Sequence, residues 1–228
     1  MPMPWSTFHA AAFPERMRAA EASRSFVWRV NRYVGIRVAY LFFLAGFSAN
    51  LLSLFRVPVA IVGFALFATL PDADSPLLPV LGLLLFMLQV HLDFADGAIA
   101  RAQQKASEFG TVIDGLGNNA SRFATFLLLG LFANNPWFLW GSVFAGYILT
   151  GFETETGNRL TPPGPLGRTV YRLAVSVIIV NIALPSALLG AGLLGADMEL
   201  VGRLGTLFYG AVAIGWLVRC LREPPHTD

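Results

Sequence analysis

The sequence D-F-A-D-G-A-I-A-R runs from Asp93 to Arg101, and after eight intervening residues G-T-V-I-D runs from Gly110 to Asp114. Both stretches lie inside segments that are otherwise apolar enough to cross a membrane. An ionised carboxylate costs free energy in the hydrocarbon region of a bilayer, so acidic residues found there usually have a function. The pattern therefore predicts a polar site built on membrane helices.

Composition places the chain among integral membrane proteins. Of its 228 residues, 55% are hydrophobic and only 13% are charged, whereas about a quarter of the residues of a soluble domain are charged. The mean hydropathy is +0.61. Apolar stretches near the ~20 residues that cross a bilayer as a helix are Leu51–Leu70, Leu77–Ala100, Val112–Phe132, Trp137–Phe152, Val170–Leu194 and Val201–Leu221.

These stretches predict an all-α integral membrane protein with about six transmembrane helices. We expect a single domain over residues 1–228, with a transmembrane core over 51–221 and a tail over 222–228.

A basic amphipathic segment over residues 16–50 precedes the first apolar stretch. Arginines alternate there with aromatic and aliphatic residues, a composition typical of a helix that lies on the membrane surface. A seventh crossing that starts near Tyr33 is the alternative, although its apolar run is shorter than the ~18 residues that a span needs.

Positive charge is concentrated on one side of the predicted membrane. Basic residues precede the first stretch, lie between the second and third and between the fourth and fifth, and follow the sixth. The opposite loops carry Asp72, Asp74, Asp197 and Glu199 against a single Arg203. By the positive-inside rule the basic side is cytoplasmic, which predicts both termini and the polar site on that side. The formal net charge is only +2, and its polarity favours anionic lipid head groups over nucleic acid as partners.

Helical spacing places the polar residues on common faces. Asp93 and Asp96 are three residues apart, and Asp114 and Asn118 are four apart, so each pair shares a face of its helix. A short turn over residues 103–107 allows the two helices to lie antiparallel. We therefore expect the four side chains to meet near the cytoplasmic surface.

The spacing of the whole pattern is D-x2-D-G-x2-A-R-x8-G-x3-D-x3-D, with Asn118 where the last aspartate belongs. It resembles the signature of the CDP-alcohol phosphotransferases, also called CDP-alcohol phosphatidyltransferases. The resemblance implies a transferase of phospholipid biosynthesis that moves a phosphatidyl group from a CDP-linked lipid, such as CDP-diacylglycerol, to a polar acceptor and releases CMP. It also implies a homodimer in a bacterial inner membrane.

The resemblance assigns roles to individual residues. Asp93, Asp96 and Asp114 are the implied ligands of Mg²⁺ or Mn²⁺, ions that take oxygen ligands and bridge phosphate oxygens. Gly97 and Arg101 are implied to bind the CDP moiety. The glycine permits close approach of the nucleotide, and the arginine can donate charge-assisted hydrogen bonds to phosphate.

Three further residues extend the resemblance to the nucleotide. Ser107 stands where members often have a hydroxyl residue that contacts it. Asn50 and Ser53, followed by Arg56, resemble the P-N-x-x-T-x-x-R segment that opens a span, although Ala49 replaces its proline.

Two arginines at the head of the fifth apolar stretch have two interpretations. Arg168 and Arg172 are four residues apart and resemble basic residues that bind an anionic head group or acceptor in some members. Positive-inside anchoring explains them equally well.

Asn118 occupies the position at which the family has the base that deprotonates the acceptor hydroxyl. An asparagine has no basicity near neutral pH. The acceptor could already be ionised, as a phosphorylated one is, or another group, such as Glu108 or a metal-bound hydroxide, could take the proton. Alternatively, the chain is a pseudoenzyme that binds CDP-lipid and metal without efficient transfer. Aspartates that pair with Arg101 and Arg122 as structural contacts, or that line an ion path, are the remaining alternatives.

Overall fold

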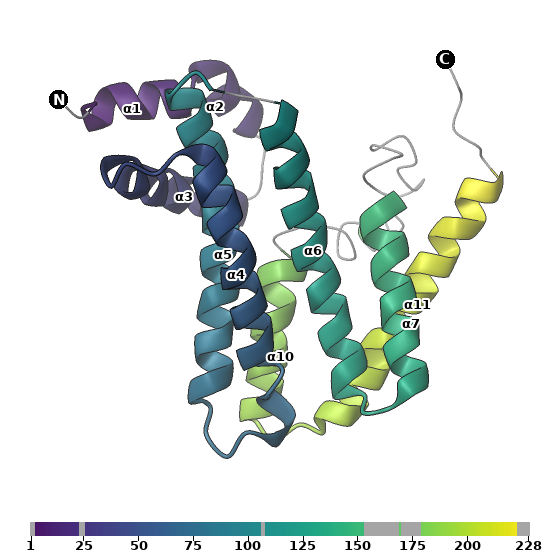
Figure 1. The fold of residues 1–228 in the computed structure, drawn as a ribbon. Coiled ribbons are helices and arrows are strands. Elements are labelled where there is room, and N and C mark those ends of the chain that lie inside the picture. Colours follow the sequence, from purple (N-terminus) through teal and green to yellow (C-terminus); the bar gives the residue numbers. More distant parts are fainter. Residues whose placement is uncertain (1–2, 23–25, 106–107, 153–168, 170–178, 223–228) are drawn as a thin grey trace. The chain divides into compact units, whose positions relative to one another are not determined.

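The chain is all-helical throughout the part that the computed structural model describes, which comprises residues 3–22, 26–105, 108–152, 169 and 179–222. This confirms the predicted all-α class. The helices are α1 (Trp5–Ala12), α2 (Glu15–Glu21), α3 (Phe26–Leu44), α4 (Ala49–Phe67), α5 (Leu77–Ala102), α6 (Glu108–Phe132), α7 (Pro136–Tyr147), α10 (Leu184–Leu193) and α11 (Met198–Arg222) (Figure 1). A 3₁₀ turn covers Leu70–Asp72, and π-helical turns cover Ile148–Phe152 and Ile179–Ala183.

Three of the helical stretches are long and apolar enough to cross a membrane: Ala49–Asp72, Leu77–Ala102 and Met198–Arg219. They coincide with the first, second and sixth predicted spans. Helices α6 and α7 cover the third and fourth, and a shorter apolar helix over Val180–Leu193 lies within the fifth. Together they form an all-α integral membrane protein, and the number of crossings stays a prediction because most of residues 153–178 lie outside the described part.

The basic amphipathic segment consists of α2 and α3, and α1 precedes it. Helix α3 is not among the membrane-spanning candidates, because Arg29, Arg32 and Arg37 interrupt its apolar run. This composition favours the surface helix over the seventh crossing.

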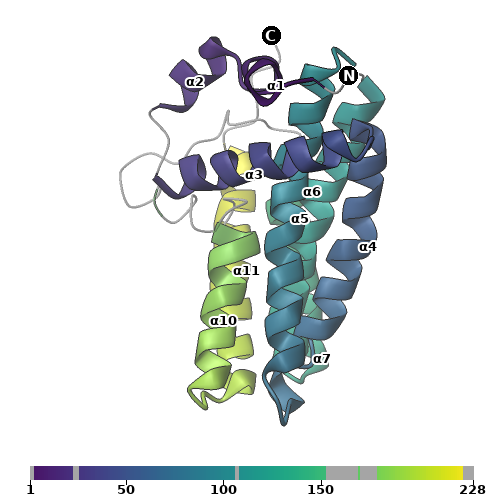
Figure 2. The same cartoon turned by 90° about the vertical axis from the view of Figure 1, so that its left-hand side faces the viewer.

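The described helices divide into two compact units, and the first comprises Met1–Val62 with Leu85–Asn118. In this unit α3 runs across the face of α5 (Figure 2). The close approach requires a glycine, since a Cβ built on Gly35 would lie 2.5 Å from the Cβ of Phe94. The core of the unit collects buried side chains from four helices: Phe8 and Ala12 of α1, Ile36 and Ala39 of α3, Leu52 and Val59 of α4, and Leu92, Ala95, Ala98, Ile99 and Ala102 of α5.

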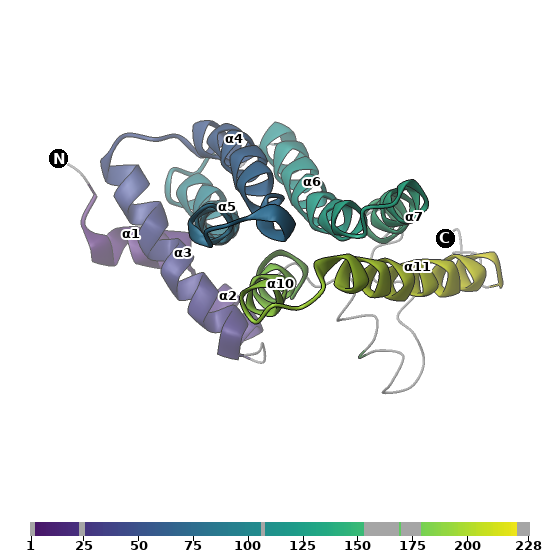
Figure 3. The same ribbon diagram turned by 90° about the horizontal axis from the view of Figure 1, so that it is seen from below.

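The second unit comprises Gly63–Leu84 with Asn119–Asp228. There α7 packs along α11 (Figures 1 and 3). Side-chain caps begin both helices: Asn135 Oδ1 accepts the N–H of Trp137 at 2.9 Å, and Asp197 Oδ1 accepts the N–H of Glu199 at 3.0 Å. Asparagine and aspartate are favoured N-caps because they satisfy N–H groups that have no partner within the helix.

Candidate active site

A buried arginine joins three helices of the first unit. Arg56 of α4 is only 2% exposed, and its Nη1 donates hydrogen bonds to Asp93 Oδ1 of α5 and, at 3.2 Å, to Asp114 Oδ1 of α6. Its Nη2 donates to the backbone carbonyl of Asp114 at 3.0 Å. Two of the three predicted metal ligands therefore face one cationic group.

The guanidinium fits only because α6 has a glycine beside it. A Cβ built on Gly117 would overlap Nη2 of Arg56, whereas a Cβ built on Gly115 would have no neighbouring atom within 4 Å. Gly117 therefore keeps open the space in which Arg56 reaches Asp114.

Asp96 makes a separate set of contacts one turn beyond Asp93. Its Oδ2 accepts the hydroxyl of Ser53 at 2.6 Å, and its Oδ1 accepts the N–H of Gly97 at 2.6 Å. The side chain is almost fully buried, with 5% of the residue exposed. Ser53, which was predicted to bind nucleotide, thus holds one carboxylate oxygen of Asp96 in place.

Asn118 lies one turn after Asp114 on the same helix, as its spacing predicts. Its Nδ2 donates to Asp114 Oδ1 over 3.5 Å. This contact brings a neutral amide, rather than a second carboxylate, against Asp114.

Arg101 at the end of α5 is partly engaged. Its Nε donates to the carbonyl of Ala12 at 2.8 Å, and Nη1 would lie 3.2 Å from a Cβ on Gly97. Its Nη2 is buried and has no hydrogen-bond partner among the described residues. The absence of a side chain at Gly97 gives the guanidinium room, and Arg101 keeps donors available to an anion.

A comparison with protein-family models finds one match, to CDP-alcohol phosphatidyltransferase, over residues 47–215. The chain belongs to the CDP-alcohol phosphatidyltransferase family. Members are enzymes that transfer a phosphatidyl group from a CDP-alcohol in lipid synthesis, and they generally depend on a divalent metal. A search of curated proteins finds no significant match to the chain.

The donor set suits the divalent metal on which the family depends. Asp93 and Asp114 converge on one point of positive charge, and carboxylate oxygens are the ligands that Mg²⁺ and Mn²⁺ prefer. Among the described residues no three acidic, histidine or cysteine side chains lie close enough together to hold a metal, and Arg56 occupies the shared face of Asp93 and Asp114. The two carboxylates fit a divalent ion by their chemistry, and in this structure their cationic partner is Arg56.

The other predicted site residues do not join this cluster. Asn50 is exposed, and its side chain makes no hydrogen bond or ion pair within the described part of the chain. Ser107, Arg168 and Arg172 lie outside the described residues.

Arg56 and Gly117 are features of the site to which the sequence pattern assigns no role, and Gln89 shares the face of α5 that carries Asp93. Gln89 is four residues before Asp93 on α5, is 2% exposed, and its Nε2 has no hydrogen-bond partner among the described residues. Its helical spacing was a usable signal, because residues four apart share a face. No comparable signal existed for Gly117, whose role depends on a side chain from another helix.

Proposed function

We propose that this family member transfers the phosphatidyl group of a CDP-linked lipid such as CDP-diacylglycerol to a polar acceptor, with Mg²⁺ or Mn²⁺ as cofactor. The observation that carries the proposal is the convergence of Asp93 and Asp114 on one cation, within the stretch that matches the family. The acceptor oxygen bonds to the lipid-side phosphorus, the bond from that phosphorus to the bridging diphosphate oxygen breaks, and CMP leaves with that oxygen.

Each residue of the cluster has a proposed role in this reaction. Asp93, Asp96 and Asp114 hold the metal, which when bound supplies positive charge to the diphosphate oxygens. Arg101 donates hydrogen bonds to phosphate through its free Nη2, and Gly97 leaves room for that side chain.

The remaining sequence predictions complete the proposal. Asn50 and Ser107 contact the nucleotide, while Arg168 and Arg172 bind the acceptor or its head group. We further propose a homodimer in a bacterial inner membrane, with both termini and the site on the cytoplasmic side.

Asn118 favours an acceptor that needs no general base. Its amide contacts Asp114 and cannot take a proton near neutral pH. A phosphorylated acceptor avoids this requirement when its own ionised phosphate oxygen attacks, and the bond that forms is then a new diphosphate linkage. The same observation supports the second candidate, a pseudoenzyme that binds CDP-lipid and metal without efficient transfer.

The test incubates the purified protein in detergent with labelled CDP-diacylglycerol, Mg²⁺ or Mn²⁺, and a panel of neutral and phosphorylated acceptors. We expect metal-dependent CMP release, and loss of CDP binding in Asp93→Ala and Asp96→Ala but not in Asp74→Ala, which removes an exposed acid. Metal-dependent CDP binding without CMP release for any acceptor would establish the pseudoenzyme. Unchanged CDP binding in both site variants would place the site elsewhere.

A further inference from the structure

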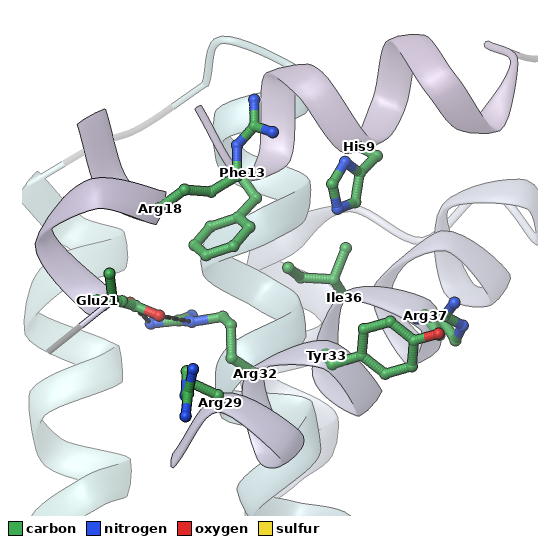
Figure 4. A pocket seen from close by; sticks show the side chains of 10 residues that line it. His9, Phe13, Arg18, Glu21, Arg29, Arg32, Tyr33, Ile36 and Arg37 are labelled. Carbon is green, nitrogen blue, oxygen red and sulfur yellow. Dashed lines mark hydrogen bonds and ion pairs between the residues drawn. The ribbon is translucent and has the colours of Figure 1, made fainter. Parts of the chain in front are cut away.

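The three N-terminal helices enclose a basic pocket in the first unit. Its volume is about 180 Å³, and it is lined by side chains of α1, α2 and α3 (Figure 4). All lining residues lie between His9 and Arg37, outside the stretch that matches the family. The pocket shares no residue with the candidate active site.

The charge of the pocket lining is strongly unbalanced. Among the described lining residues, four are arginines (Arg18, Arg29, Arg32 and Arg37) and one, Glu21, is acidic. The Glu21 carboxylate is already paired, because Arg32 donates to both of its oxygens at 2.7 and 3.1 Å, the contact drawn dashed in Figure 4. Three of the lining arginines therefore have no carboxylate partner among the described residues.

Two of the four lining arginines, Arg32 and Arg37, stack on aromatic rings. The guanidinium carbon of Arg37 lies 3.4 Å from the ring centroid of Tyr33, and that of Arg32 lies 4.5 Å from the centroid of Phe94. Stacking fixes the guanidinium plane and leaves the N–H edge of Arg37 available, whereas the N–H edge of Arg32 is already paired with Glu21. The side chains of Arg18 and Arg29 have no hydrogen-bond or ion-pair partner in the described part of the chain. The pocket lining therefore combines two unpaired arginines, one that is only stacked (Arg37) and one that is stacked and paired with Glu21 (Arg32).

Helix α3, which helps to line the pocket, also exposes large apolar side chains. Phe26, Val30, Tyr33, Leu41 and Leu44 are between 43% and 73% exposed. At about 100° per residue they fall within about 80° of one another around α3, a sector that also holds the exposed Arg37. Such a stripe on a helix that carries arginines is typical of a helix lying in the membrane interface.

We propose that this pocket binds the phosphate of an anionic phospholipid head group. Arginine binds phosphate through charge-assisted, often bidentate, hydrogen bonds. The cavity is smaller than the ~300–1,000 Å³ of typical small-molecule sites, which suits a head group better than a nucleotide. Inorganic phosphate offers the same chemistry, but only a lipid also places acyl chains along the exposed stripe of α3.

Native mass spectrometry of the full-length protein in mild detergent tests the proposal, with phosphatidylglycerol, phosphatidylcholine and inorganic phosphate as probes. The wild type should retain phosphatidylglycerol in preference to the other two. The double variant Arg18→Gln/Arg29→Gln should bind it at least about tenfold more weakly, since two charge-assisted contacts are lost. The variant should keep its fold, because neither side chain has a hydrogen-bond or ion-pair partner among the described residues.

A matched variant separates the pocket from general charge attraction. Arg16→Gln/Arg222→Gln removes the same charge at two exposed positions that do not line the pocket, and it should retain wild-type preference. Equal weakening in both double variants, or equal retention of phosphatidylcholine by the wild type, overturns the proposal. Tight binding of inorganic phosphate would show a site for free phosphate instead. None of these results depends on CMP release, so failure here and failure of the transferase proposal are distinguishable.

Discussion

Replacing Arg56 by alanine should destabilise the metal-free protein and make its stability depend on metal. The guanidinium is 2% exposed and pairs with Asp93, whose side chain is 16% exposed, and with Asp114, at 45%. Without Arg56 the carboxylate of Asp93 loses its counter-ion while it stays largely buried. Removing one partner of a buried pair costs about 3–5 kcal/mol.

The lower end of that range applies here. Asp114 is nearly half exposed, so water solvates its carboxylate when Arg56 is removed. Exposed ion pairs contribute about 1 kcal/mol or less. We therefore expect the free energy of unfolding to fall by about 3 kcal/mol, most of it from Asp93. Under the proposed function, a divalent ion then occupies the vacated position. An ion present at 100 times its Kd contributes about 2.7 kcal/mol, enough to recover most of the loss.

Thermal unfolding in detergent, with either EDTA or Mg²⁺, measures both effects. Without metal, Arg56→Ala should have a lower Tm than the wild type, and Mg²⁺ should raise its Tm more than that of the wild type, in which the ion must first displace the guanidinium. Arg56→Lys keeps one charge and should lie between them. Arg203→Ala is the control, because it breaks an i,i+4 ion pair with Glu199 in which both side chains are 42% exposed. Its effect should be about 0.5 kcal/mol or less and independent of Mg²⁺.

Two outcomes would refute this reasoning. A metal-free Arg56→Ala protein as stable as the wild type would mean that the guanidinium is not the counter-ion of Asp93. A Tm increase with Mg²⁺ that is the same in the wild type, Arg56→Ala and Arg203→Ala would mean that Asp93 and Asp114 do not hold the ion.

Three further changes test the surroundings of this arginine. Asn118→Asp should raise CMP release with a neutral alcohol by about 100- to 10,000-fold at saturating metal and change little with a phosphorylated acceptor; a similar increase for both acceptors would exclude a general-base role. Gly117→Ala places a methyl group on the guanidinium and should lower the free energy of unfolding by about 1–3 kcal/mol. Gly115→Ala places its methyl group in open space and should raise the free energy of unfolding by up to about 1 kcal/mol. Equal free energies of unfolding for the two glycine variants, measured by chemical denaturation, would contradict the geometry. Ser53→Ala removes the 2.6 Å hydrogen bond to Asp96 and should weaken metal-dependent CDP binding measured by calorimetry, while unchanged binding would remove Asp96 from the metal site.

Periodicity predicted the helices and the shared faces because both depend on neighbours along one helix. Long apolar runs defined α4, α5 and α11, and three- and four-residue spacings placed Asp93 with Asp96 and Asp114 with Asn118. The caps at Asn135 and Asp197 also follow local rules, so the turns at these positions were predictable.

Contacts between helices that are distant in sequence were not predictable in this way. The contact of Arg56 with Asp93 and Asp114 depends on how closely α4, α5 and α6 approach, and Gly117 leaves the room that the guanidinium occupies there. Likewise, the hydrogen bond from Arg101 to the carbonyl of Ala12 joins residues that are 89 positions apart in the sequence. A single sequence contains both partners of such a contact but nothing that pairs them.

The charge of the cluster links Asn118 to Arg56. Asp93, Asp96, Asp114 and Arg56 carry a formal charge of −2 together, and an aspartate at position 118 would make it −3. Each added carboxylate strengthens the attraction for a cation, so Asn118 weakens metal binding as well as removing a base. In the metal-free protein, the neutral Asn118 leaves the positive charge of Arg56 closer to neutralising Asp93 and Asp114. The two effects separate only at saturating metal, where affinity no longer limits the rate. An increase in CMP release that persists there belongs to proton transfer, and one that disappears belongs to metal recruitment.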